Sequence, residues 1–243
     1  MPNPFFHFKS FSILSQDKGL RVTTDACLLG ALANFETEGK ALDIGTGTGV
    51  VAMFMAQKYP NTLIDAIEIE AAVIEQASFN IQNSPFKDRI QLIQADFLQH
   101  QFSQQYACIV SNPPYFKDHL EKEASEKNNA IHASLLNHQA MLDKVTEILH
   151  PDGCFYCILP PYQMTELIDK ARVKGLQAER IIRIFNKPDK HYRDIVCFNF
   201  SSREMQEQLI LLHDESGKKT DEFHRLMSDF YLEDTSIYKK NKQ

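Results

Sequence analysis

The stretch ALDIGTGTGV, residues 41–50, indicates how the centre of this chain folds. Its apolar beginning is typical of a buried strand, and a helical pattern, VVAMFMAQKY, overlaps its end. Between them, Gly45, Gly47 and Gly49 allow a tight turn and let a ligand approach the backbone closely. The spacing G-x-G-x-G differs from the G-x-G-x-x-G of dinucleotide-binding turns. The stretch therefore predicts a strand, a ligand-binding turn and a helix.

Strands and helices alternate on either side of this unit. Strands are expected at residues 40–45, 63–70, 89–97, 106–115, 154–160, 179–185 and 194–200. Helices are expected at residues 50–59, 71–82 and 134–149, the last one stopping at HPDG, residues 150–153. Such alternation predicts an α/β fold with a doubly wound, mostly parallel sheet. The last two strands are expected to form an antiparallel pair at its edge.

Four consecutive strands bring polar side chains to the carboxyl edge of this sheet. Asp43 precedes the glycine turn, Glu68 lies near the end of the second strand, Asp96 ends the third and Asn112 the fourth. Ligands of open α/β sheets bind at this edge, and a carboxylate at Glu68 can accept hydrogen bonds from ribose hydroxyls. The sequence therefore predicts one ligand crevice that these four residues line.

The sequence SNPPYF, residues 111–116, ends the fourth strand in an unusual way. Proline has no N–H, so strand pairing must stop at Pro113, and the residue before each proline is held extended. The result is a stiff hook with the Asn112 amide at its base and the Tyr115 ring at its tip. Taken alone, the tetrapeptide fits a strand terminator with a surface tyrosine equally well.

Composition places the chain among ordinary globular proteins. It has 243 residues, of which 43% are hydrophobic and 24% charged. No apolar run is long enough for a membrane span, and the start does not resemble a signal peptide. The five cysteines are an odd number and lie mostly in expected strands, so reduced core thiols are expected. A cytoplasmic protein is expected.

The net charge of −6 does not indicate a nucleic-acid binder, but the distribution of charged residues along the chain is compatible with one. Residues 170–194 contain eight Lys and Arg but only three Asp and Glu. This region could form a phosphate-binding surface or simply a solvated one, and both interpretations remain open. The basic residues singled out for RNA contact are Arg180, Arg183, Lys187, Lys190 and Arg193. No metal is expected, because His119, His132 and His138 do not match the spacing of a strong metal motif.

The set D-x-G-T-G-T-G, E-x-E, A-D-F and N-P-P-Y resembles the class I S-adenosylmethionine-dependent methyltransferases that methylate amino groups. The resemblance implies that the glycine turn wraps the methionine part of the cofactor, with Asp43 near its amino group. It further implies that Glu68 holds the ribose and Asp96 with Phe97 the adenine. The implied cofactor-binding set is Asp43, Gly45, Thr46, Gly47, Gly49, Glu68, Ile69, Asp96, Phe97 and Asn112.

The two ends of the chain narrow the resemblance. Residues 8–33 and the tail DFYL, residues 229–232, are similar to the bacterial valine tRNA adenine-37 N6-methyltransferases, in which a short hairpin precedes the first helix. Thr24 or Asp25 could contact the cofactor or cap the helix ACLLGALANF that follows, and the structural role is at least as well supported. Residues 130–134, AIHAS, depart from that family by lacking an expected arginine. The similarity implies a seven-stranded Rossmann-like methyltransferase sheet within a single domain, with residues 1–38 as an N-terminal extension and 39–243 as the core.

This resemblance also implies a reaction, the N6-methylation of adenine 37 in the anticodon loop of a valine tRNA. The implied catalytic residues are Asn112, Pro113, Pro114 and Tyr115. The implied partners are S-adenosylmethionine and a tRNA, and a monomer is expected. The same hook suits an rRNA amine or a glutamine amide of a protein, so these substrates remain alternatives, as does an RNA-binding protein or chaperone without catalysis.

Overall fold

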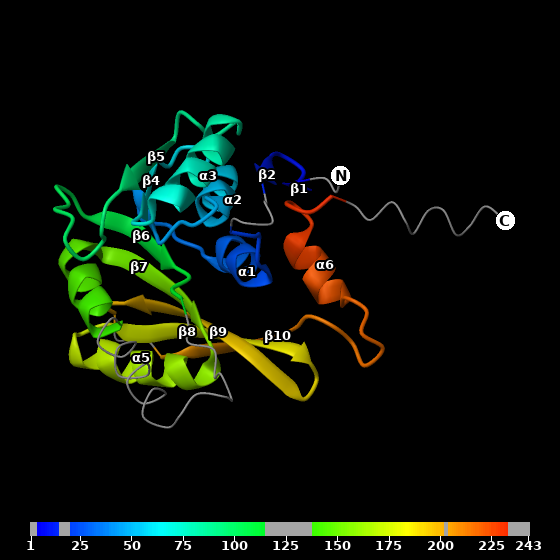
Figure 1. The fold of residues 1–243 in the computed structure, drawn as a ribbon. Helices are drawn as coiled ribbons and strands as arrows, with labels where there is room; N and C mark the ends of the chain where they lie inside the picture. Colours follow the sequence, from blue (N-terminus) through cyan, green and yellow to red (C-terminus); the bar gives the residue numbers. More distant parts are fainter. Residues whose placement is uncertain (1–3, 15–19, 115–137, 202–203, 233–243) are drawn as a thin grey trace, which may run out of the picture.

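The computed structural model describes residues 4–14, 20–114, 138–201 and 204–232 (Figure 1). Within these residues, eight strands form one sheet in the order β10-β8-β9-β7-β6-β3-β4-β5. The strands are β3 (Ala41–Ile44), β4 (Ile64–Glu68), β5 (Ile90–Gln94), β6 (Tyr106–Ser111), β7 (Leu149–Leu159), β8 (Gln177–Lys187), β9 (Lys190–Asn199) and β10 (Gln206–Leu211).

The sheet is mostly parallel, as the sequence predicts, with three differences in detail. Among the eight described strands of this sheet, β9 alone runs against its neighbours, and it lies between β7 and β8 rather than at the edge. β10 then pairs parallel to β8 and takes the edge position, so the sheet has eight strands instead of the expected seven. β7 also begins earlier than expected, because Leu149 already pairs with Tyr106, while HPDG forms an irregularity before regular pairing with β6 resumes at Cys154.

Helices cover both faces of the sheet. The labelled helices are α1 (Thr24–Leu32), α2 (Val50–Lys58), α3 (Ala71–Gln82), α5 (Pro161–Val173) and α6 (Asp221–Met227), and residues 138–148 form another. In Figure 1, α1, α2 and α3 lie on one face, while α5 and the helix of residues 138–148 lie on the other. Among the described residues, no helix is long and apolar enough to cross a lipid bilayer.

The alternation of side chains along the strands separates two hydrophobic cores. On β7, Tyr156 and Ile158 face the core of α1 and α2, whereas Phe155 and Cys157 face the core of α5. The period of two in a strand produces this division. It also places Cys154 on the opposite face from Cys157, so these two thiols of the C-x-x-C sequence point away from each other.

The two ends of the described chain pack against each other on the face of α1 and α2. β1 (Phe5–His7) and β2 (Ser12–Leu14) form the expected N-terminal hairpin. Phe8 bridges to Tyr231 as an isolated antiparallel pair, and the Phe230 ring stacks on Phe54 of α2 with centroids 4.0 Å apart. The resemblance in leader and tail thus corresponds to two segments that share one core.

The cap of α1 differs from both expected candidates. The Thr23 side chain accepts a hydrogen bond from the backbone N–H of Ala26 at 3.2 Å, so Thr23 is the N-cap. Thr24 already lies within the helix, and Asp25 is buried in its first turn. The Thr-Thr-Asp sequence therefore uses its first residue as the cap.

Candidate active site

The register of the parallel strands brings the predicted site residues to one edge of the sheet. The last pairs of β3 join Ile44 to Ile67 of β4 and to Ser111 of β6. The next residue of each strand therefore lies at the same level of the carboxyl edge, where Glu68 still pairs with Gln94 of β5. These next residues are Gly45, Glu68 and Asn112, with Asp96 two positions beyond the end of β5.

The glycine turn between β3 and α2 depends on left-handed backbone. Gly45 has a φ of 67° and Gly47 a φ of 58°, a region in which side chains with a Cβ are strained. The N–H groups of Gly45 and Thr46 both donate to the carbonyl of Ile67, at 2.9 and 3.0 Å. A Cβ added at Gly45 would meet no atom within 4 Å, so this part of the turn faces open space.

Glu68 connects the end of β4 with this turn. Its Oε2 accepts a hydrogen bond from the Gly47 N–H at 3.1 Å. Its Oε1 accepts from the N–H groups of Ile69 and Glu70, at 2.9 and 3.2 Å. Three backbone donors therefore fix this half-buried carboxylate beside the turn. Ile69, the next residue, leaves 57% of its surface exposed at the same edge.

Asp43 lies beneath the turn and is 1% exposed. Its Oδ2 accepts hydrogen bonds from the Thr46 hydroxyl at 2.6 Å and from the Ala52 N–H at 3.2 Å. Burial raises the pKa of Asp43 to about 7, these two hydrogen bonds oppose the rise, and the charge of Glu68 adds to it. Asp43 therefore supports the turn from below, and Glu68 is the carboxylate that is partly exposed at this edge of the sheet.

Asn112 presents a hydrogen-bond acceptor that nothing in the described structure satisfies. Its Oδ1 is buried, and no described residue donates to it. Leaving a buried acceptor unpaired costs about 1–3 kcal/mol, so such a group calls for an explanation. Pro113 is half-buried and Pro114 exposed, while Tyr115 lies outside the described residues. The base of the predicted hook is therefore an acceptor without a donor.

The two residues predicted to hold an adenine differ in exposure. The Asp96 carboxylate is partly buried, and its Oδ1 accepts a hydrogen bond from the Leu98 N–H at 2.9 Å. Phe97 is 9% exposed and packs in the core beside Phe102, with ring centroids 5.8 Å apart. Asp96 thus stands at the edge of the sheet, whereas most of the Phe97 ring belongs to the core.

Two amides on α3 hold the N-terminal extension over the glycine turn, a feature that the sequence did not reveal. Gln76 donates to the carbonyls of Leu14 and Leu20, at 2.6 and 2.8 Å, and accepts from the Leu20 N–H at 3.1 Å. Asn80 accepts from the Leu14 N–H at 2.7 Å and donates to the Thr48 carbonyl at 2.9 Å. The sequence did contain a clue, because Gln76 and Asn80 lie on the same helix face as the apolar Ala77 and Ile81, where a polar side chain needs a buried partner.

Three of the five basic residues predicted to contact RNA bind other side chains instead. Arg193 donates to Asp25 at 2.8 Å, and Arg183 donates to Glu207 at 2.6 Å. Arg180 bonds Gln208 of β10. Lys187 and Lys190 are exposed and form no ion pair with a described residue. These two lysines flank the turn of the β8–β9 hairpin.

The hairpin turn lies at the same edge of the sheet as Asn112. β9 makes its last pair with β7 between Asp194 and Leu159, while β9 itself begins at Lys190. Residues 190–193 therefore extend beyond the end of β7, and the hairpin projects past the neighbouring strands (Figure 1). Lys187 pairs with Lys190 at its tip.

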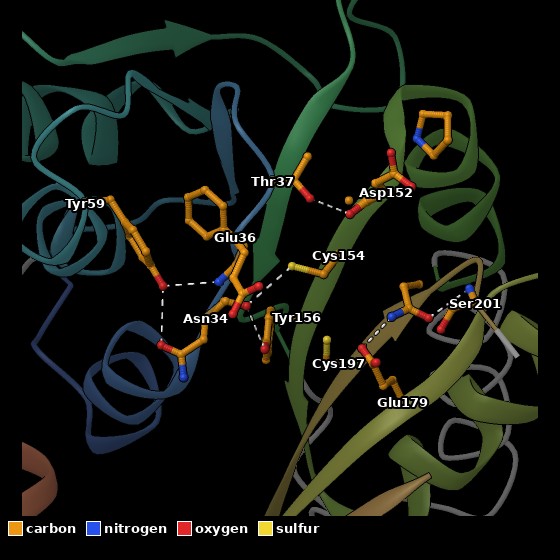
Figure 2. Close-up of a pocket in the computed structure, with 14 residues that line it drawn as sticks. Asn34, Glu36, Thr37, Tyr59, Asp152, Cys154, Tyr156, Glu179, Cys197 and Ser201 are labelled. Carbon is orange, nitrogen blue, oxygen red and sulfur yellow. Dashed lines mark hydrogen bonds between the residues drawn. The ribbon is translucent and has the colours of Figure 1, made fainter. Parts of the chain in front are cut away.

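A cavity of about 800 Å³ lies at the opposite, amino edge of β7 and contains none of the predicted site residues (Figure 2). Its polar groups largely bond one another, since the Tyr156 hydroxyl and the Cys154 thiol both donate to the Asn34 carbonyl. Hydrogen bonding between neighbouring thiols, together with burial, raises the pKa of Cys154 and of Cys197. These thiols are therefore protonated and unreactive. Within the described part of the chain, no group of three His, Cys, Asp or Glu residues is placed to hold a metal ion.

Solved structures with a similar arrangement of strands and helices include methyltransferases. A predicted O-methyltransferase from Agrobacterium tumefaciens matches with a TM-score of 0.65 at 18% identity, covering 85% of this chain and 96% of that one. A methyltransferase from Pyrococcus furiosus matches with a TM-score of 0.57 at 20% identity, covering 79% and 89%. The family model of the methyltransferase small domain matches residues 11–159. Fold and sequence therefore define a methyltransferase.

Closer relatives identify the family. The tRNA1(Val) (adenine(37)-N6)-methyltransferase of Pedobacter heparinus is 35% identical over 230 residues, which cover 93% of this chain and 97% of the relative. The enzymes of the same name from Bacteroides fragilis and Actinobacillus pleuropneumoniae are 35% and 36% identical, covering 96% and 93% of this chain and 99% and 97% of the relatives. The chain belongs to the family of tRNA1(Val) (adenine(37)-N6)-methyltransferases.

Proposed function

We propose that this enzyme transfers a methyl group from S-adenosylmethionine to the N6 amine of adenine 37 in a valine tRNA. The names and near full-length coverage of its relatives support this substrate. One observation within the site carries the proposal. The buried Oδ1 of Asn112, unpaired among the described residues, is an acceptor placed for the N–H of an incoming amine.

The residues of the crevice fit the proposed cofactor. When bound, S-adenosylmethionine would supply an activated methyl group on a positively charged sulfur. The half-buried carboxylate of Glu68 suits such a positively charged ligand, and Asp43 would support the glycine turn from below. Glu68 would hold ribose hydroxyls, and Asp96 with Ile69 would bind the adenine at the ends of β5 and β4. The open side of Gly45 leaves room for the ligand to approach the backbone.

Asn112 and Pro113 would orient the amine of the substrate. An exocyclic amine of adenine is a poor nucleophile, because its lone pair is delocalised into the ring. If the Asn112 side-chain oxygen and the Pro113 carbonyl each accept one N–H, the nitrogen is drawn toward a tetrahedral geometry. Its lone pair then points along a fixed direction, and this orientation is worth roughly several kcal/mol. The adjoining prolines keep both acceptors in place.

The proposed reaction needs no strong general base at this site. The cofactor would supply the methyl group together with its positive charge, so the N6 nitrogen that accepts the methyl group would carry an acidic proton. The proton can therefore leave to water after the transfer. Asn112 contributes by holding the N–H groups, and Tyr115 is proposed to stack on the flipped base.

The exposed Lys187 and Lys190 at the tip of the hairpin would bind phosphates of the anticodon arm. Both lie at the edge of the sheet that carries Asn112. Arg180, Arg183 and Arg193 have side-chain partners in the protein. The proposed RNA-binding surface therefore includes only two of the five basic residues that the sequence suggests. A loop adenine is a suitable target, since it is unpaired and costs little to extrude.

We further propose that the chain is one domain and acts as a monomer in the cytoplasm, where its tRNA substrate occurs. Phe8, Phe11 and Phe230 support the single domain, because they belong to the same core as Phe54 of α2. The extension of residues 1–38 would then be an integral part of the catalytic core.

The reaction is tested by incubating the protein with methyl-labelled S-adenosylmethionine and a valine tRNA transcript that carries no modifications. Digestion and mass spectrometry of the nucleosides should show labelled N6-methyladenosine. A transcript with guanine in place of adenine 37 is the control and should remain unlabelled. Label in the control would show that another position is methylated, and no label in either transcript would refute tRNA as the substrate.

A further inference from the structure

A second Pro-Pro-Tyr sequence follows the strand beside β6. Residues 160–162 read Pro-Pro-Tyr directly after β7, as residues 113–115 do after Asn112. α5 begins at Pro161, so proline occupies the first helical position, for which its fixed φ is suited. β7 therefore ends in a stiff turn that leads straight into a helix.

The register of the two strands places this turn next to the hook. β6 and β7 are parallel, with Ser111 opposite Cys157, and β7 continues to Leu159. Neighbouring strands lie about 4.8 Å apart, so the end of β7 at Leu159 lies beside the end of β6, from which the hook emerges. The three residues from Leu159 to Tyr162 span at most about 10 Å. Because β3 and the glycine turn lie on the other side of β6, Tyr162 stands on the side of Asn112 away from the cofactor crevice.

Tyr162 presents an aromatic ring to solvent at this position. It is 68% exposed, and its hydroxyl hydrogen-bonds Glu166 one turn further along α5. The next residue, Gln163, has a buried Oε1 to which no described residue donates. An exposed ring alone is ordinary on a protein surface. Here it lies one strand from the proposed catalytic acceptor and next to a second unpaired acceptor, which together indicate a binding surface.

The chemistry of an extruded base indicates what such a ring would contact. When a nucleotide is flipped out of a loop, the base beside it loses a stacking partner. An aromatic side chain can take that place, and single-stranded RNA is commonly bound by stacking of its bases on such rings. An exposed ring that follows the strand next to Asn112 is suited to such a contact.

We propose that Tyr162 stacks on the base of a nucleotide next to the methylated adenine and thereby positions the substrate. The inference rests on the proposed function and adds a substrate-binding residue from β7 and α5 to it. Gln163 would accept a hydrogen bond from the same nucleotide through its unpaired Oε1. Recognition would then extend along the sheet edge from Asn112 to Tyr162.

The test compares Tyr162→Ala and Tyr162→Phe with the wild type on the unmodified valine tRNA transcript. Loss of one base–aromatic stack corresponds to a decrease in kcat/KM of about 5- to 150-fold, expected mainly through a higher KM. Tyr162→Phe keeps the ring and should remain within about threefold of the wild type. Val173→Ala, at the exposed far end of the same helix, is the matched control and should change nothing.

Two abasic transcripts identify the contact itself. Each lacks the base on one side of adenine 37, and on one of them the wild type and Tyr162→Ala should have equal kcat/KM. Cofactor affinity, measured by calorimetry, and the thermal midpoint should be the same for all variants, because Tyr162 lies on the surface.

The outcomes separate this inference from the function on which it rests. If the wild type methylates the tRNA and Tyr162→Ala does so equally well, the inference fails and the proposed function stands. A loss in Tyr162→Ala that persists on both abasic transcripts also refutes the stacking. If the wild type does not methylate the tRNA, the proposed function fails, and the inference with it.

Discussion

Arg193 of β9 and Asp25 of α1 form an ion pair in the interior of the protein. Arg193 Nε donates to Asp25 Oδ2 at 2.8 Å, and the two side chains are 13% and 2% exposed. The Arg193 guanidinium also lies over the Tyr192 ring, 4.1 Å from its centroid. The pair joins the start of the first helix to the hairpin that carries Lys187 and Lys190. A residue that the sequence suggests for RNA contact therefore has a structural partner.

Arg193→Ala should therefore destabilise the protein. Removing one partner of a buried ion pair leaves the other charge uncompensated and costs about 3–5 kcal/mol. The free energy of unfolding in urea at pH 7 measures this cost. Arg172→Ala is the control, because its pair with Asp169 is exposed and contributes at most about 1 kcal/mol. Equal stability of the two variants would contradict the structural role of Arg193.

Lys187→Glu and Lys190→Glu should leave stability unchanged and weaken tRNA binding. A lysine that contacts a phosphate releases a counterion on binding, so each variant should bind more weakly and with a salt slope smaller by about one. Dissociation constants measured from 50 to 200 mM salt test this. Lys87→Glu makes the same charge change at the opposite edge, just before β5. Should Lys87→Glu lower the affinity as much, the hairpin is not a specific contact.

The stability of the protein should depend on the ionisation of Asp43. Burial raises the pKa of Asp43 to about 7, from an ordinary value near 3.8, so the folded protein binds its proton more tightly than the unfolded chain does. The neutral form is favoured in the fold, and stability is therefore lost as the pH rises from about 4 through 7. Asp43→Asn cannot ionise and should lack this loss.

Comparing the wild type with Asp43→Asn separates the contribution of Asp43 to the pH dependence of stability from that of other titrating groups. The free energy of unfolding of the wild type, minus that of Asp43→Asn, should be larger at pH 5 than at pH 8. A difference that stays constant or grows with pH would show that Asp43 does not titrate in this range.

The site at the sheet edge follows from local sequence, and this explains why most of it could be predicted. Buried strands end in characteristic residues, and in parallel strands those ends meet at one edge. Once the alternation of strands and helices is recognised, the proximity of Gly45, Glu68 and Asn112 can be predicted, and the register of the strands agrees with it. Their hydrogen bonds could not be predicted, because the Glu68 carboxylate bonds N–H groups both of its own strand end and of the glycine turn.

The errors arose where distant segments meet. The sequence QEQLIL of β10 has three polar residues followed by three apolar ones, so it shows neither the alternation nor the continuous apolar run that is typical of a strand. Arg193 and Asp25 are 168 positions apart, so counting charges between residues 170 and 194 could not show that they pair. Gln76 and Asn80 are buried because the N-terminal extension packs on α3, which the helical pattern alone does not reveal.

The central claim is that Asn112 provides the acceptor that orients the amine. The most direct test is the single-turnover rate of methyl transfer by Asn112→Ala, measured together with its cofactor affinity and thermal midpoint. The rate should fall by about 10²–10³, as for the loss of one preorganised hydrogen bond in a transition state. Cofactor affinity should be unchanged, and stability unchanged or higher, since no described donor loses its partner. A variant that binds the cofactor and transfers the methyl group at the wild-type rate would contradict the account.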